Sequence, residues 1–307
     1  MNAIVAWKAG SASDAGLARG INEDRVLVDD QNGVFAVIDG LGGHAAGEMA
    51  AETAAASIRE QKYDATVDPE RFIRTAITDA NNRVYDLAKT NADWSGMACV
   101  LTLAVLREEE LTVGHVGDTR LYLVWNGTLR KITSDHSPVG ELEDGGQLTE
   151  EEAMRHPRRN EVFRDVGSRL REPDDKGFIE IKRLPCKPDA ALLLCTDGLT
   201  DVLPSPQITE IIDRYDGDVD AVAHQLVAAA NQAGGTDNIS LIFIAGPEFL
   251  GAHSATLTET RTRHAVTRPR RRRLPWRSIW GSVFWLVVGF VLGILLWSQI
   301  ARLRWHI

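Results

Sequence analysis

The sequence is poor in cysteine, and no two cysteines have the spacing of a metal site. Cys99, Cys186 and Cys195 are odd in number and far apart, so neither a disulfide framework nor a zinc site is indicated. Cys99 and Cys195 lie within apolar runs, which predicts small core residues. The first 16 residues lack an apolar run long enough for a secretory signal, so we expect the domain to stay in the cytoplasm.

Basic residues are scarce in the first 250 positions. Residues 251–307 contain ten arginines, no lysine and one acid, Glu259, a net charge of +9, which leaves residues 1–250 with 24 bases against 42 acids, or −18. Binding to nucleic acid depends on neutralising phosphates with lysine and arginine. We therefore expect no nucleic-acid partner. Either the acids simply keep the domain soluble, or some of them are metal ligands.

Repeats of 20–50 residues are absent, and residues 1–245 mix strand-like with helix-like patterns. Two dipeptides, Asn32-Gly33 and Asn126-Gly127, favour the positive φ of tight hairpin turns. They predict antiparallel pairing and argue against an all-parallel nucleotide-binding sheet. The runs with strand character are residues 25–29, 33–38, 97–106, 110–116, 120–125, 129–133, 191–196 and 238–245.

Three helices are predicted. The clearest begins at Asp68-Pro69, an N-cap followed by proline in the first turn, and places apolar residues from Ile73 to Leu87 on one stripe. The others are expected at about 47–61 and 218–232. Because these helices accompany antiparallel strands, we expect an α+β fold in which packed sheets are covered by helices.

Charge is also absent from residues 278–301, which follow a polar linker with an arginine run, residues 248–277. As a helix, these 24 residues would extend about 36 Å, enough to cross a hydrocarbon core of about 30 Å. Tryptophans lie near both ends, and six arginines precede the span while two follow it. This predicts one C-terminal transmembrane helix, with the N-terminal side in the cytoplasm and a short tail of residues 302–307.

Five short acidic motifs are present in the first 245 residues. Each alone is typical of a turn. However, Asp39, Asp197 and Asp237 each fall at the end of a predicted strand or just before one, and strand ends can converge on one cleft. The motifs are Arg19-Gly-Ile-Asn-Glu23-Asp24, Asp39-Gly40-Leu-Gly-Gly-His44, Gly117-Asp118-Thr-Arg120, Thr196-Asp197-Gly-Leu-Thr-Asp201 and Gly235-Thr-Asp237-Asn238.

Carboxylates in one cleft suit hard cations such as Mg²⁺ and Mn²⁺, which prefer oxygen ligands. Two such ions about 3.5–4 Å apart can share a bridging hydroxide that attacks a phosphoryl group, so that no covalent enzyme intermediate is needed. A guanidinium can hold two phosphate oxygens for in-line attack. Arg19 is the best-placed arginine for that task.

In this order and spacing, the motifs resemble the metal-dependent protein phosphatase family, type 2C, in its bacterial form, over about residues 8–245. The resemblance implies a catalytic domain of residues 1–247 with a central antiparallel β-sandwich flanked by helices, in four layers, α/β/β/α. It also implies hydrolysis of phosphoserine and phosphothreonine on proteins.

The same resemblance implies roles for individual residues. Arg19 matches the phosphate-binding arginine, and Arg19, Asp39 and Asp237 are then the catalytic residues. Asp118, joined by Asp201, matches the site of a third, weaker ion. The set implied for the two Mn²⁺ or Mg²⁺ ions is Asp39, the Gly40 carbonyl, Asp197 and Asp237, with Glu23 and Asp24 binding directly or through water.

Some roles stay open. Residues 140–160 resemble the mobile flap beside the family's active site, although a surface loop containing a helix has the same pattern. The general acid is not assigned. His44 lies four positions after Gly40 and not directly after it, so we expect it to begin a helix; His115 and His136 are expected to be structural.

Three other functions fit the sequence less well. A pseudophosphatase that only binds phosphoproteins would have lost metal ligands, whereas every ligand position retains its acid. A structural membrane tether needs no such acids, and calcineurin-like metallophosphoesterases use histidine motifs that the sequence lacks. We therefore expect a protein-serine/threonine phosphatase at the inner face of the cell membrane, acting on phosphorylated proteins that a Ser/Thr kinase targets.

Overall fold

The computed structural model describes residues 7–43 and 45–252, which belong to one compact unit, Met1–Glu259. A second unit, Thr260–Ile307, lies outside the described residues, and so do His44 and the predicted transmembrane helix. Within the described part of the chain, we find no helix of sufficient length and apolarity to span a membrane.

Two five-stranded sheets form the centre of the unit, and every pair of neighbouring strands is antiparallel. The first sheet has the order β1 (Lys8–Asp14), β10 (Ile239–Ala245), β9 (Ala191–Cys195), β6 (Arg120–Trp125) and β7 (Thr128–Lys131). The second has the order β2 (Arg25–Asp29), β3 (Val34–Leu41), β4 (Ala98–Arg107), β5 (Glu110–Val116) and β8 (Glu180–Pro185).

Both predicted hairpins are present. Residues Gly33, Asn126 and Gly127 have φ values of 68°, 52° and 68°, in the left-handed region that the turns require. They join β2 to β3 and β6 to β7. The antiparallel pairing expected from these dipeptides is thus confirmed.

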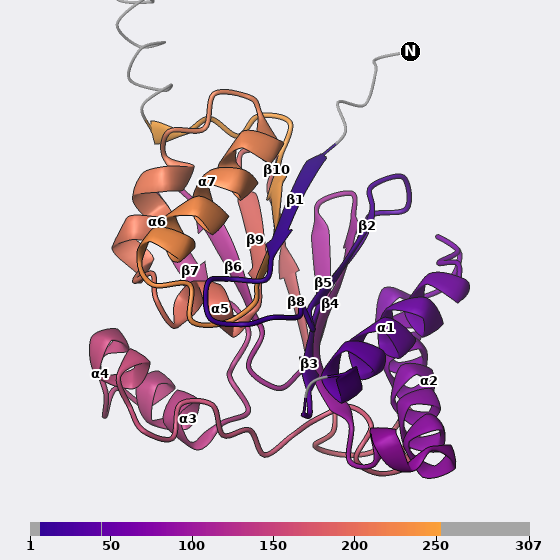
Figure 1. Cartoon of the computed structure of the whole chain (residues 1–307). Helices are drawn as coiled ribbons and strands as arrows, with labels where there is room; N and C mark the ends of the chain where they lie inside the picture. The colour runs from indigo at the N-terminus through magenta and orange to yellow at the C-terminus, as the bar shows by residue number, and fades with distance from the viewer. Residues whose placement is uncertain (1–6, 44, 253–307) are drawn as a thin grey trace, which may run out of the picture. The chain divides into compact units, whose positions relative to one another are not determined.

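Helices cover the outer face of each sheet (Figure 1). On the second sheet lie α1 (Ala45–Glu60) and α2 (Pro69–Thr90), and on the first lie α6 (Ser205–Ile212) and α7 (Val219–Gln232). The Asp68 side chain caps α2 by accepting a hydrogen bond from Arg71 N at 3.1 Å, as its sequence predicts. Short helices occupy the remaining connections: η1 (Ala92–Trp94), α3 (Pro138–Asp144), α4 (Glu150–Met154) and α5 (Asp197–Thr200).

Three apolar cores separate these four layers. Alternate residues of a strand enter different cores: Ala36 and Ile38 of β3 pack against α1 and α2, whereas Phe35 and Val37 pack between the sheets. In β9, Leu193 packs toward α7 and Leu192 toward the other sheet. Because both faces are buried, the central strands are apolar throughout. The predicted four-layer α+β architecture is confirmed.

Two strands and several short helices were not predicted from the sequence. Strand β1 (KAGSASD) consists of small and polar residues, and β8 (EIKRLP) is partly charged. Each lies at the edge of a sheet and pairs on one side only. Their place depends on hydrogen bonds to the neighbouring strand, which leave little trace in local composition.

Candidate metal centre and active site

The acidic motifs converge at one end of the two sheets. Asp39 lies near the end of β3, and Asp24 directly precedes β2, whose Arg25 pairs with Ile38. In the other sheet, Cys195 at the end of β9 pairs with Leu241 near the start of β10 and with Arg120 at the start of β6. The adjoining acids are Asp197 after β9, Asp237 before β10 and Asp118 before β6.

The electrostatics of these acids show that they form one cluster. Burial raises the pKa of Asp24 and that of Asp118 to about 7. The pKa values of Asp39 and Asp197 rise well above their usual range, first through burial and then through repulsion from the other carboxylates. Carboxylates that raise one another's pKa in this way would be stabilised by a bound cation. Asp39 and Asp197 keep part of their surface exposed, so an ion from solution can reach them.

Asp24 provides a direct test of whether the site suits a metal. Its Oδ2 accepts a hydrogen bond from Thr196 Oγ1 at 2.9 Å, but its Oδ1 is buried without a hydrogen-bond partner among the described residues. Buried carboxylate oxygens without a partner are costly. An all-oxygen donor set with unbalanced negative charge fits Mg²⁺ or Mn²⁺.

Glycines allow Glu23 and Gly40 to approach each other. A Cβ at Gly40 would lie 2.2 Å from Gly47 O and 2.8 Å from Glu23 O, and a Cβ at Gly47 would lie 3.0 Å from the Glu23 carboxyl carbon. Larger residues at either position would push the backbones apart. The structure therefore brings the Glu23 carboxylate to the start of α1, beside the predicted Gly40 ligand.

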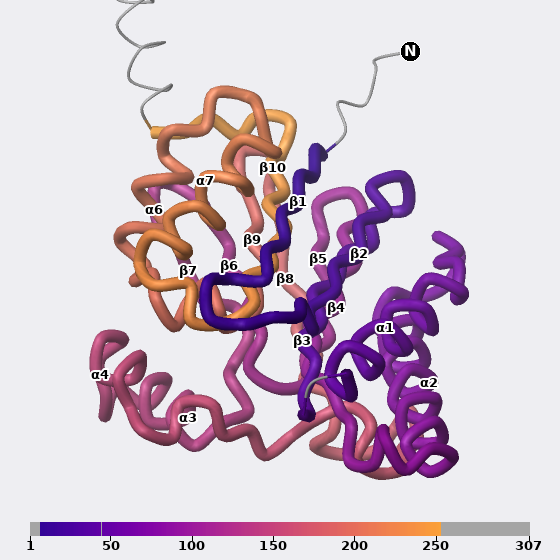
Figure 2. The backbone as a smooth tube through the Cα atoms, viewed as in Figure 1, coloured from indigo at the N-terminus to yellow at the C-terminus, as the bar shows by residue number. Residues whose placement is uncertain are grey.

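Arg19 lies on the connection between β1 and β2, the indigo loop below β1 in Figure 2. Its Nη2 donates to Asp237 Oδ2 at 2.8 Å, so the guanidinium reaches the acidic cluster, while 47% of the side chain stays exposed. This position fits the predicted phosphate ligand, because part of the fork remains open to a substrate.

Asn238 holds the β1–β2 connection in place through hydrogen bonds, a role that was not predicted from the sequence. Its Nδ2 donates to the backbone carbonyls of Ala15 and Ile21, both at 2.9 Å, and its Oδ1 accepts from Glu23 N at 2.8 Å. One buried side chain thus holds three backbone groups on both sides of Arg19. Such a contact fixes the position of Arg19 and Glu23 relative to Asp237.

The turn that carries Asp118 is also held by side chains behind it. Arg120 makes a bidentate pair with Asp135, from Nε to Oδ1 at 3.2 Å and from Nη2 to Oδ2 at 2.6 Å, and its Nη2 also donates to Glu143 of α3 at 2.8 Å. Gly117 O accepts from His136 N at 2.6 Å, and Gly117 N donates to His136 Nδ1 at 3.0 Å. His136 therefore supports the Asp118 turn, as expected of a structural histidine.

A second group of metal-type side chains consists of His115, His136 and Glu180, whose ligand atoms lie within 4.8 Å of one another. Cations surround it: Lys182 contacts Glu180 at 3.0 Å, and Arg164 Nη1 lies 2.9 Å from His136 Nε2. His136 Nδ1 already accepts a hydrogen bond, so its neutral ring has no lone pair left for a metal. No three of the described aspartates lie as close, but carboxylates that surround two ions 3.5–4 Å apart need not do so.

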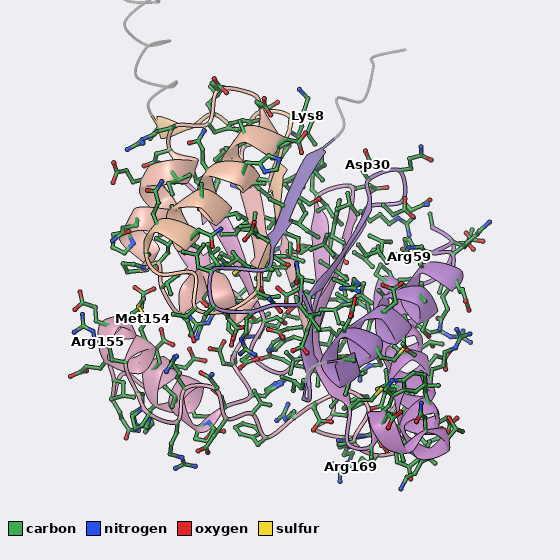
Figure 3. All side chains as sticks on the ribbon, in the orientation of Figure 1. Lys8, Asp30, Arg59, Met154, Arg155 and Arg169 are labelled. Atoms are coloured by element: carbon green, nitrogen blue, oxygen red, sulfur yellow. The ribbon has the colours of Figure 1, made fainter. Side chains whose placement is uncertain are left out.

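The segment between β7 and β8 contains α3 and α4 and borders the acidic cluster. A small cavity of about 30 Å³ is lined by Asp118, Asp197 and Asp201 together with residues of α3 and α4. Arg159, just after α4, donates from Nε to Asp201 Oδ2 at 2.9 Å. The predicted flap thus lies beside the acidic cluster, where Met154 lines the cavity and Arg155, next to it, is exposed (Figure 3).

Comparison with known families agrees with this geometry. Residues 18–234 match the family described as protein phosphatase 2C. The chain belongs to this family. It is accordingly a metal-dependent protein serine/threonine phosphatase whose substrates are phosphoproteins.

Relatives of this phosphatase include the serine/threonine phosphatase stp of Listeria monocytogenes, which is 32% identical over 242 residues, or 76% of this chain and 93% of the relative. The solved structure of the Mycobacterium tuberculosis phosphatase PstP is similar with a TM-score of 0.70 and 30% identity, covering 78% of this chain and 98% of that one. A further structure, the PstP catalytic domain with two manganese ions, has a TM-score of 0.68 and 28% identity over 78% of this chain and 98% of that one.

Proposed function

We propose that this phosphatase works with two Mn²⁺ or Mg²⁺ ions held by the acidic cluster. The observation that carries the proposal is that acids from both sheets converge at one end, where the buried Asp24 Oδ1 has no hydrogen-bond partner among the described residues. The two manganese ions in the PstP structure support it. The proposed ligands are Asp39, the Gly40 carbonyl, Asp197 and Asp237, with Glu23 and Asp24 binding directly or through water.

When bound, the ions would supply a nucleophile from water at neutral pH and neutralise charge on the phosphoryl oxygens. Arg19 would orient the phosphate by exchanging its contact with Asp237 for two phosphate oxygens. Asn238 would keep the arginine and Glu23 in register with Asp237 during this exchange. Asp118 and Asp201, which share one cavity, would hold a third, weaker ion.

Hydrolysis of a phosphothreonine peptide tests the proposal. We expect the chain to need Mn²⁺, to be inactive in EDTA and to lose at least about 1,000-fold of its activity in the Asp39→Asn, Asp237→Asn double variant. Asp30→Asn is the matched control, because Asp30 is exposed at the end of the sheets where Figure 3 labels it, opposite the acidic cluster. Unchanged activity in EDTA would contradict the metal mechanism.

We propose in addition that residues 278–301 anchor the phosphatase to the inner face of the cell membrane, with residues 248–277 as a linker. The uncharged span and the arginine excess before it support this. The substrates would then be membrane-associated targets of a Ser/Thr kinase, since tethering raises effective concentration. A chain ending at Pro247 should leave the membrane fraction and fail to restore phosphoprotein levels at matched expression; full restoration would contradict the proposal.

A further inference from the structure

Large exposed apolar side chains flank Arg19 in the sequence. The described residues expose six large apolar side chains, and two of these, Leu17 at 71% and Ile21 at 41%, lie on the β1–β2 connection. Residues 15–22 carry no charge other than that of Arg19. Single exposed apolar residues are common on protein surfaces, but two that flank a site residue call for a physical reason.

The connection is too firmly held for these side chains to turn inward. Gly235 O accepts hydrogen bonds from Leu17 N at 2.7 Å and from Ala18 N at 3.2 Å. At the other end, the carbonyl of Ile21 accepts from Asn238 Nδ2 at 2.9 Å. A Cβ at Gly235 would lie 2.9 Å from Leu17 Cγ, so the two segments are in close contact. The apolar side chains thus stay in water unless another molecule covers them.

We propose that Leu17 and Ile21 form an apolar subsite for the residues that flank the phosphoserine or phosphothreonine. Each lies two positions from Arg19, and an extended peptide advances about 3.3–3.6 Å per residue. Residues one or two positions from the phosphate therefore come within reach. The subsite rests on the proposed role of Arg19, and it favours substrates with apolar rather than acidic flanks.

The occupant is the substrate because the subsite is continuous with the active site. The same connection brings Arg19 to 2.8 Å from Asp237. Acidic flanking residues are disfavoured for two reasons. Their carboxylates would lose water on contact with leucine and isoleucine, and they would approach a domain of strongly negative net charge. Apolar flanks would gain the contact without that repulsion.

Steady-state kinetics of the full chain with Mn²⁺ tests the proposal. Three substrates are compared: a phosphothreonine peptide with leucine on both sides, the same peptide with glutamate there, and p-nitrophenyl phosphate, which has no flanking residues. We expect kcat/KM to be about 10-fold higher for the leucine peptide, mainly through KM. In the Leu17→Ser, Ile21→Ser variant, this preference should fall to about twofold, with turnover of p-nitrophenyl phosphate unchanged.

Leu250→Ser is the matched control, because Leu250 is 57% exposed and follows β10 at the end of the sheet opposite Asp237. It should keep the full preference. Equal kcat/KM for the two peptides, or loss of the preference in the control, would overturn the subsite. A fall in p-nitrophenyl phosphate turnover equal to the fall on the leucine peptide would overturn it too, since the two side chains would then only support the connection. Failure of the wild type to hydrolyse p-nitrophenyl phosphate with Mn²⁺ would instead refute the proposed metal mechanism.

Discussion

Two groups of charges meet at one cavity, which members of both groups line, and they are balanced in opposite ways. In the ion-pair network, Arg120 and Lys131 face Asp135, Glu143 and Asp144, with contacts of 2.6 to 3.7 Å. Although burial opposes it, Arg120 holds the pKa of Asp135 below its usual range. In the acidic cluster, by contrast, burial and mutual repulsion raise the pKa of Asp39 and Asp197.

The contrast separates charges that stabilise the fold from charges that need a ligand. A buried carboxylate with its own arginine keeps a position, and removing it leaves an unpaired cation. A group of buried carboxylates that repel one another costs stability, and such groups are common at functional sites. The pKa of aspartate is therefore shifted in opposite directions at two positions of one segment, upward at Asp118 and downward at Asp135.

The largest expected effect is on catalysis. Asp197→Asn removes one acid of the cluster and should lower phosphopeptide turnover by about 1,000-fold or more, because the proposed ions lose a ligand. Asp189→Asn, at an exposed position near the other end of β9, should leave turnover unchanged. Near-normal turnover of Asp197→Asn would place the active site elsewhere.

Loss of one aspartate should change the free energy of unfolding, measured in EDTA, in opposite directions in the ion-pair network and in the acidic cluster. Asp135→Asn should lower the free energy of unfolding by about 3 kcal/mol, because Arg120 loses its bidentate partner. Asp39→Asn should raise it by about 1 kcal/mol, because repulsion within the cluster is reduced. Urea unfolding measures both, and equal signs would contradict the comparison.

A smaller effect is expected at the residue that joins the cluster to Arg19. Asn238→Ala frees the carbonyls of Ala15 and Ile21 and should lower kcat/KM by about 30-fold, since a slight misplacement of a positioning group is costly. Asn231→Ala is the control, because Asn231 Nδ2 donates to Asp14 Oδ1 at 3.1 Å, at the end of β1 and before the connection. An equal loss in both variants would rule out a specific role for Asn238.

The smallest effect concerns His136, the neutral histidine that holds the Asp118 turn. Burial, followed by the nearby His115, lowers the pKa of His136 to about 3, from 6.5 in an unfolded chain. Its contribution is therefore complete above pH 6.5 and is lost as pH falls from 6.5 toward 3, by about 2 kcal/mol at pH 5. His136→Asn keeps an acceptor for Gly117 N and should show a flatter dependence of unfolding free energy on pH. Parallel curves for wild type and variant would refute this.

How far the sequence predicts the molecule depends on how local each feature is. The hairpins at Asn32-Gly33 and Asn126-Gly127 follow from the backbone preferences of these dipeptides. Asp39, Asp197 and Asp237 could be placed at strand ends because the apolar pattern of a strand shows where it ends. Edge strands β1 and β8 could not, since their pairing and not their composition defines them.

Contacts between residues that are far apart in the sequence could not be predicted either. Asn238 belongs to a recognised motif, yet its bonds to residues more than 200 positions earlier exist only in the fold. The contacts of Arg159 with Asp201 and of Arg120 with Asp135 were not predictable either, because in the sequence these residues look like ordinary surface charges. The sequence thus predicted acids that the fold brings together, but not the neighbours that position or balance them.

Calorimetric titration of Mn²⁺ into the full chain tests most directly whether the unbalanced carboxylates form a metal site. We expect the wild type to bind at least two ions, Asp135→Asn to bind the same number, and the Asp39→Asn, Asp237→Asn variant to lose them. No binding by the wild type, or equal binding by the double variant, would contradict the account.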